Sequence, residues 1–89
     1  MRRIRVKYLL WLAEKAGTAG EELILNDGSL RELLELIKKV RPGLSKYMED
    51  ILNGVSELIL LVNHNPPASL EVHLKDGDEV VIMPPVSGG

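Results

Sequence analysis

One amphipathic segment near the middle of the chain, residues 29–41, contains the signals for both ends of a helix. Ser29 is a good N-cap, and Glu32 three residues later completes a capping box. Leucine, isoleucine and valine then recur with helical spacing. Pro42 disfavours the helical conformation at Arg41, so the helix is predicted to end there. A helix with one apolar stripe needs an apolar surface to cover, and the flanking segments are predicted to supply it.

The segments on both sides of this helix have the patterns of strands. In residues 3–10, Ile4, Val6, Tyr8 and Leu10 alternate with mainly basic residues, which is the period of a half-buried strand, and the first three are predicted to face the core. Residues 21–26 form a second strand between turn signals. Residues 58–62 are continuously apolar, as in a strand well inside a sheet. Residues 71–74 are a candidate short edge strand, and residues 79–83 are the last predicted strand.

The remaining segments predict one more helix and several connections. Residues 44–52 carry a shorter amphipathic stripe, which indicates a second helix. Residues 11–16, closed by Gly17, are predicted to be a turn or an irregular crossing, and 63–67 must be a loop because it contains two prolines. The predicted order is therefore β-β-α-(α)-β-(β)-β. One helix across one face of a mixed sheet buries both apolar surfaces, which makes the chain an α+β protein.

Composition narrows the possible functions. The 89 residues suffice for one domain, and the net charge of −2 with only three aromatic side chains argues against a nucleic-acid-binding surface. The absence of cysteine excludes disulfides, thiol nucleophiles and thiolate metal sites. His64 and His73 have no third ligand pattern nearby, so we expect no metal site. The apolar runs are too short to cross a bilayer and no signal peptide is recognisable, so we expect a soluble cytoplasmic protein.

The end of the chain carries the most specific signal. Its last six residues are Pro84-Pro85-Val86-Ser87-Gly88-Gly89, after the predicted strand 79–83. Residues 74–89 closely resemble the end of the MoaD/ThiS sulfur-carrier family, and this ending is more similar to MoaD than to ThiS. Residues 4–8, 12–17 and 62–63 are also similar to the family pattern, so the resemblance covers essentially the whole chain. Two features depart from it: the sequence His64-Asn65-Pro66-Pro67, and the basic residues Arg5 and Lys7 on the first strand.

This resemblance implies a fold. A ubiquitin-like β-grasp domain is expected over residues 1–84, with a mixed four- to five-stranded sheet, one main helix and a short second helix. An extended, flexible C-terminal Gly-Gly tail is expected over residues 85–89.

The resemblance also implies a function, a sulfur carrier in the biosynthesis of the molybdopterin or tungstopterin cofactor. An E1-like adenylating enzyme (MoeB-like) would use ATP to adenylate the carboxylate of Gly89. Sulfur would then replace one oxygen to give a thiocarboxylate, and the large subunit of molybdopterin synthase (MoaE-like) would use that sulfur. The chain would bind no cofactor itself and would not be catalytic alone.

The residue types of the tail suit this role. Gly88 and Gly89 lack a Cβ, so they can pass through a narrow channel and adopt backbone angles closed to other residues. The preceding prolines favour extended geometry, which holds the tail away from the domain. Six extended residues reach roughly 20 Å, which is enough to enter the active site of another subunit.

A docking surface is predicted on the sheet. Because successive strand residues point to opposite faces, the residues between the core-facing positions point outward and form an apolar patch. Exposed contiguous apolar surface marks interaction sites. We therefore expect the synthase subunit and the activating enzyme to bind in turn to a surface that runs into the tail, formed by Leu9, Ile59, Leu61, Val81, Met83, Pro84, Pro85 and Val86.

Three other interpretations remain open. The same activated carboxyl group would serve a ubiquitin-like modifier joined through Gly89 to lysines of other proteins. A related carrier would supply sulfur for thiamine synthesis or tRNA thiolation. A plain binding module with an inert tail is the third. The Pro-Pro-Val sequence before Ser87 favours the synthase subunit.

Overall fold

A computed structural model describes residues 1–26 and 28–85. The tail residues Val86, Gly88 and Gly89, on which the predicted chemistry depends, lie outside the described residues. The elements, in chain order, are β1 (Arg2–Tyr8), α1 (Trp11–Ala16), β2 (Gly20–Leu25), α2 (Leu30–Val40), a 3-10 turn (Pro42–Leu44), α3 (Ser45–Leu52), β3 (Ile59–Val62) and β4 (Glu79–Met83).

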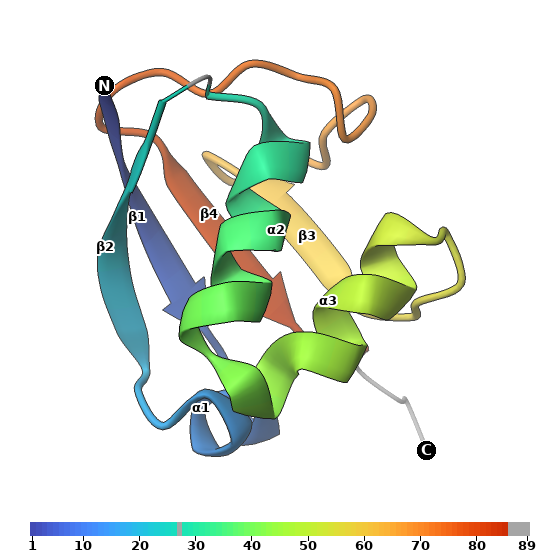
Figure 1. The fold of residues 1–89 in the computed structure, drawn as a ribbon. Coiled ribbons are helices and arrows are strands. Elements are labelled where there is room, and N and C mark those ends of the chain that lie inside the picture. The colour runs from blue at the N-terminus through green and yellow to red at the C-terminus, as the bar shows by residue number, and fades with distance from the viewer. Residues whose placement is uncertain (27, 86–89) are drawn as a thin grey trace.

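The four strands form one mixed sheet in the order β2-β1-β4-β3. β1 pairs with β2 and β3 with β4 in antiparallel fashion, and the central pair β1 and β4 is parallel. Helix α2 crosses one face of the sheet with α3 beside it (Figure 1). In the part of the chain that the structure describes, no helix covers the opposite face, which we call the open face. This arrangement confirms the predicted α+β class.

The core lies between α2 and the sheet. Alternate residues of the two central strands, Ile4, Val6 and Tyr8 of β1 and Val80 and Ile82 of β4, are at most 1% exposed. They pack in one cluster with the stripe of α2, formed by Leu30, Leu33, Leu34 and Ile37, and with Leu44 and Met48 from the segment that follows. Each such side chain contributes about 1.5–3 kcal/mol through burial, so the sheet and α2 stabilise one another.

The start of α2 follows its sequence signal. The hydroxyl of Ser29 accepts a hydrogen bond from the N–H of Glu32 at 3.0 Å. The carboxylate of Glu32 reaches back beyond the cap and accepts from the N–H groups of Asn26 and Gly28, at 3.1 and 2.8 Å. The capping interaction therefore also fixes the connection between β2 and α2.

The segment predicted to be irregular, residues 11–16, is instead the short helix α1. Its N-cap residue Leu10 has a φ of 56° and provides no side-chain cap, so the capping signal that usually marks a helix start is absent. The predicted first strand ran to residue 10, whereas β1 ends at Tyr8 and excludes Leu10. Its positive φ turns the chain away after Tyr8 and leaves its side chain 68% exposed.

The predicted edge strand at residues 71–74 is also wrong, because this segment pairs with the start of α2 rather than with the sheet. Leu30 N–H donates to the carbonyl of Val72 at 3.0 Å, and Arg31 N–H donates to that of Leu70 at 2.8 Å. The first N–H groups of a helix have no partner within it. The carbonyl groups of Leu70 and Val72 supply acceptors to two of them.

The residues that follow β3 form a tight hairpin turn. Asn63 and His64 have φ values of 49° and 72°, and the backbones of Val62 and Asn65 exchange hydrogen bonds of 2.8 and 3.0 Å. Positive φ at both central residues defines the type I′ turn, whose twist suits a hairpin. The turn precedes the two prolines of the predicted loop.

Candidate functional site

The chain leaves the domain at one end of the sheet. Met83, the last residue of β4, pairs with Ile59 at the start of β3, while Ile82 pairs with Tyr8 at the end of β1. Pro84 is buried and Pro85 is exposed. The chain therefore leaves the sheet through the buried Pro84, at the end of the sheet where β1 finishes and β3 begins (Figure 1).

The five predicted outward residues of the sheet lie on the open face. In the β3–β4 register Ile59 is opposite Met83, and Leu61 is opposite Val81. Leu9 continues the alternation of β1 by one residue, and its N–H donates to the carbonyl of Ile82 at 3.1 Å. Three neighbouring strands thus contribute to one surface, which we call the open-face patch (Leu9, Ile59, Leu61, Val81 and Met83).

The patch residues differ in how much surface they offer. Leu9 and Ile59 are each 36% exposed, and Leu61 and Met83 are half-buried. Val81 lies in the middle of the patch and is only 8% exposed, because its register neighbours Lys7 and Leu61 flank it on both sides. A partner would therefore contact mainly the four residues around Val81.

Basic side chains border the patch on β1. Lys7 Nζ lies 3.3 Å from a carboxylate oxygen of Glu79, and Arg3 Nε lies 3.9 Å from one of Glu22. Arg5 points to the same face and takes part in no ion pair within residues 1–26 and 28–85. The free guanidinium favours a partner with acidic groups at the corresponding edge.

Asn63 fixes the register of the two strands that carry most of the patch. Its side-chain oxygen accepts from the N–H of Glu79 at 3.0 Å, and its amide donates to Asp78 at 2.9 Å. The other carboxylate oxygen of Asp78 accepts from the N–H of Lys75 at 2.7 Å. The acidic residues near Gly77 therefore act as turn-forming acceptors, and no metal-binding cluster of three His, Asp or Glu side chains occurs in the described residues.

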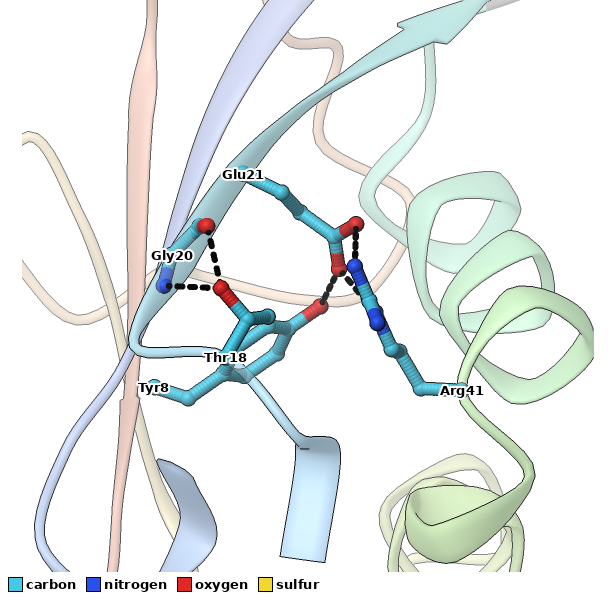
Figure 2. A network of polar contacts seen from close by, with 5 residues as sticks. All are labelled: Tyr8, Thr18, Gly20, Glu21 and Arg41. Atoms are coloured by element: carbon cyan, nitrogen blue, oxygen red, sulfur yellow. Dashed lines mark hydrogen bonds and ion pairs between the residues drawn. The ribbon is translucent and has the colours of Figure 1, made fainter. Parts of the chain in front are cut away.

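A polar network on the opposite side of the sheet was not foreseen from the sequence. The phenol of Tyr8 donates to Glu21 Oε2 at 2.6 Å, and Arg41 donates to both carboxylate oxygens, at 2.9 and 2.7 Å (Figure 2). The hydrogen bonds from Arg41 lower the pKa of Glu21, and burial raises the pKa of Tyr8. Nearby, Thr18 Oγ1 donates to the carbonyl of Gly20 at 2.9 Å. The network joins β1, β2 and the end of α2, so its role is structural.

A hollow of about 420 Å³ lies beside the point where the chain leaves the domain. Trp11, Tyr47, Pro84 and Pro85 contribute apolar surface to it, and Asp50 and Glu57 contribute carboxylates. Sequence reasoning missed it because its residues come from four separate segments. We call it the tail-base hollow.

Within the part of the chain that the structure describes, the candidate site has two components. It offers an apolar patch with a basic border, and a hollow at the base of the residues that follow. Such a surface can bind and orient a partner protein. None of the described helices is both long and apolar enough to span a membrane.

The sequence pattern of the ThiS family matches residues 6–89, nearly the whole length of the protein. The chain belongs to the ThiS family. This confirms the resemblance that the end of the sequence indicated.

A relative and a solved structure are consistent with this family assignment. A "Molybdopterin synthase sulfur carrier subunit" from Chlamydomonas reinhardtii is 35% identical over 88 residues, covering 98% of this chain and 99% of the relative. A Pyrococcus furiosus structure described as molybdopterin converting factor, subunit 1, is 32% identical, with a TM-score of 0.80 and coverage of 97% and 100% of the two chains. This similarity confirms the expected ubiquitin-like β-grasp fold.

Two further solved structures share this fold, one of a small modifier protein and one of a complex between two subunits. Small archaeal modifier protein 1 of Methanosarcina acetivorans is 30% identical, with a TM-score of 0.79 and coverage of 100% and 98%. A complex of subunits 1 and 2 of the molybdopterin-converting factor from Helicobacter pylori contains a chain that is 24% identical, with a TM-score of 0.67 and coverage of 98% and 99%.

Proposed function

We propose that this protein is the sulfur carrier of a molybdopterin synthase and that the carboxylate of Gly89 is the group that carries the sulfur. The observation that carries the proposal is the 35% identity, over 98% of the chain, to a molybdopterin synthase sulfur carrier subunit. The position of Pro84 supports it. A buried proline at the sheet end gives the following residues a fixed base beside the open-face patch.

The chemistry proceeds in two stages at one carboxyl group. An activating enzyme joins the Gly89 carboxylate to the AMP portion of ATP, and pyrophosphate leaves. Hydrosulfide then attacks the acyl carbon and AMP leaves, which gives the thiocarboxylate directly. A persulfide donor gives an acyl disulfide instead, and a thiol then reduces its S–S bond, so that the donor leaves as a mixed disulfide and the thiocarboxylate remains. The carrier needs no catalytic side chain for either stage, because the activating enzyme supplies the catalysis.

The open-face patch is the part of the carrier that both partners recognise in turn. It lies on the strands that meet beside Pro84, so a protein that covers Met83 and Ile59 is placed to receive the tail. The complex of the Helicobacter pylori subunits supports a large synthase subunit as one of these partners. Arg5 and the other basic residues of β1 favour acidic groups on the partner.

Reconstitution tests this function. The full chain, and a variant that lacks Gly89, are incubated with the activating enzyme, ATP and a sulfur donor, and then with the large subunit and the pterin precursor. We expect sulfur transfer from the full chain and none from the truncated variant. The two proteins should have the same melting temperature, because terminal residues seldom contribute packing. Sulfur transfer by the truncated variant would contradict the proposal.

A second function follows from the similarity to small archaeal modifier protein 1. The same adenylated Gly89 would react with a lysine amine of another protein, forming an isopeptide bond and releasing AMP. Capture of conjugates from the native cells tests this alternative. Peptides with Gly89 joined to a lysine would establish a modifier, either beside the carrier function or in its place.

A further inference from the structure

The tail-base hollow combines an aromatic wall with two carboxylates. Trp11 begins α1 and Tyr47 lies on α3, with ring centroids 5.3 Å apart and ring planes inclined at 56°. Asp50 follows Tyr47 by three residues on α3, so the two side chains share one side of that helix. Glu57 comes from the connection between α3 and β3. Three segments therefore place aromatic faces and negative charge around one hollow.

The charge of the hollow is not balanced within the described chain. Of the described residues that line it, none is a lysine or an arginine. Neither Asp50 nor Glu57 takes part in any of the ion pairs formed by residues 1–26 and 28–85. Trp11 is 41% exposed and Val55, on the same hollow, is 70% exposed. The surface thus offers apolar contact and uncompensated negative charge together.

A guanidinium group matches this combination better than any other side chain. Its flat face stacks on aromatic rings, and its N–H groups donate in pairs to carboxylates. An apolar neighbour of the arginine would cover Val55. By contrast, the carboxylate proposed at Gly89 would be repelled by Asp50 and Glu57, so charge disfavours the chain's own tail as the occupant.

The location of the hollow connects it to the transfer of the tail. Pro84 and Pro85 line it and are the last residues that the structure describes. Any protein that receives the residues after Pro85 must approach this end of the sheet. We propose that the tail-base hollow is a second docking point that binds an arginine side chain, flanked by an apolar residue, of the partner that receives the tail. This inference rests on the proposed carrier function.

A direct test uses a peptide probe. Trp11 is the only tryptophan, so its fluorescence reports on the hollow alone. The probe is acetyl-leucyl-arginine amide, and its control is the same peptide with neutral citrulline in place of arginine. We expect saturable quenching by the arginine peptide, and loss of that quenching in the Asp50→Asn/Glu57→Gln variant. Equal responses to the two peptides, or no response, would overturn the proposal.

A second test uses the full chain with the large synthase subunit. Val55→Lys places a positive charge in the hollow, and the matched control Val40→Lys changes a valine that is 42% exposed on α2 and does not line it. We expect Val55→Lys to weaken binding at least tenfold, as for a charge pair at an interface, and Val40→Lys to leave it unchanged. Equal effects, or unchanged affinity for Val55→Lys, would overturn the proposal.

Further measurements distinguish other occupants of the hollow, and they separate a failure of the docking point from a failure of the carrier function. A change in Trp11 emission when residues 86–89 are removed, with no partner present, would assign the hollow to the chain's own tail. Emission that depends on protein concentration would assign it to a second copy. Normal binding by Val55→Lys with tail-dependent sulfur transfer overturns only the docking point, whereas sulfur transfer without the tail overturns the carrier function itself.

Discussion

The phenol of Tyr8, which is 1% exposed, donates a 2.6 Å hydrogen bond to Oε2 of Glu21 on the neighbouring strand. A buried hydroxyl that loses its acceptor costs about 1–3 kcal/mol. We expect Glu21→Ala to lower the free energy of unfolding by that amount, and Tyr8→Phe to recover part of it when both changes are combined. Urea unfolding of the two single variants and the double variant measures the coupling.

Glu22→Ala is the control for this experiment. Glu22 is the next residue on β2 and forms only an exposed pair with Arg3 at 3.9 Å. Exposed ion pairs contribute about 0–1 kcal/mol, so this change should have little effect. Additive effects of the Tyr8 and Glu21 changes would contradict the structural role assigned to their hydrogen bond.

The acid side of the stability profile should depend on Glu21. Its pKa is lowered in the folded protein, first by the hydrogen bonds from Arg41, so the folded state binds its proton less tightly than the unfolded state. Stability from this group is therefore present above the unfolded pKa and lost as the pH falls through the folded pKa. We expect the free energy of unfolding of Glu21→Gln to fall less steeply below about pH 4.5 than that of the parent. The free energy of unfolding is measured with urea at several pH values. Equal slopes against pH for the variant and the parent on the acid side would contradict this prediction.

Gly43 marks a close approach between two segments. A Cβ added there would collide with the backbone carbonyl oxygen of Lys15, at the end of α1. Because this neighbour is backbone, the two segments would have to separate, and we expect Gly43→Ala to destabilise the protein by about 1–3 kcal/mol. Thermal unfolding measures this effect. In the control Gly54→Asn, the new Cβ has open space and asparagine tolerates the positive φ of 75°. Equal melting temperatures for Gly43→Ala and the parent would contradict the contact.

The elements that the sequence predicted correctly are those with local signals. α2 has its capping box and its proline stop, and β4 spans residues 79–83 as predicted. α1 was missed because it has only six residues and its N-cap residue, Leu10, has no capping side chain. Residues 71–74 have an extended pattern, but the open N–H groups of α2 attract them in place of the sheet. This pairing depends on the tertiary structure, so the local sequence pattern does not predict it.

The candidate site was likewise predicted only where a local sequence signal exists. Strict alternation along β3 and β4 was enough to place Ile59, Leu61 and Met83 on the open face. The alternation did not indicate that Val81 is shielded by its neighbours. Its burial depends on the side chains of Lys7 on β1 and Leu61 on β3, which lie on either side of it. The tail-base hollow needs residues from α1, α3 and the end of β4 together, and no spacing within the sequence reports that contact.

The open-face patch should control partner binding without controlling the fold. We expect Met83→Glu to weaken binding of the large subunit by at least about tenfold, because a charge would be buried in an apolar contact. Ile24→Glu is the matched control, since Ile24 is 51% exposed on the same face but lies on β2, away from the patch. Calorimetry with each variant measures the affinity, and circular dichroism confirms the fold. Unchanged affinity for Met83→Glu would remove the patch from the interface.

The most direct test of the sulfur-carrier function is an intact mass spectrum of the protein recovered from its native cells without reducing or alkylating treatment. We expect a fraction in which one oxygen of the Gly89 carboxylate is replaced by sulfur, and we expect this fraction to disappear when the activating enzyme is absent. A tail that is unmodified in every preparation, or that is found only in isopeptide linkage to lysines, would contradict the carrier function.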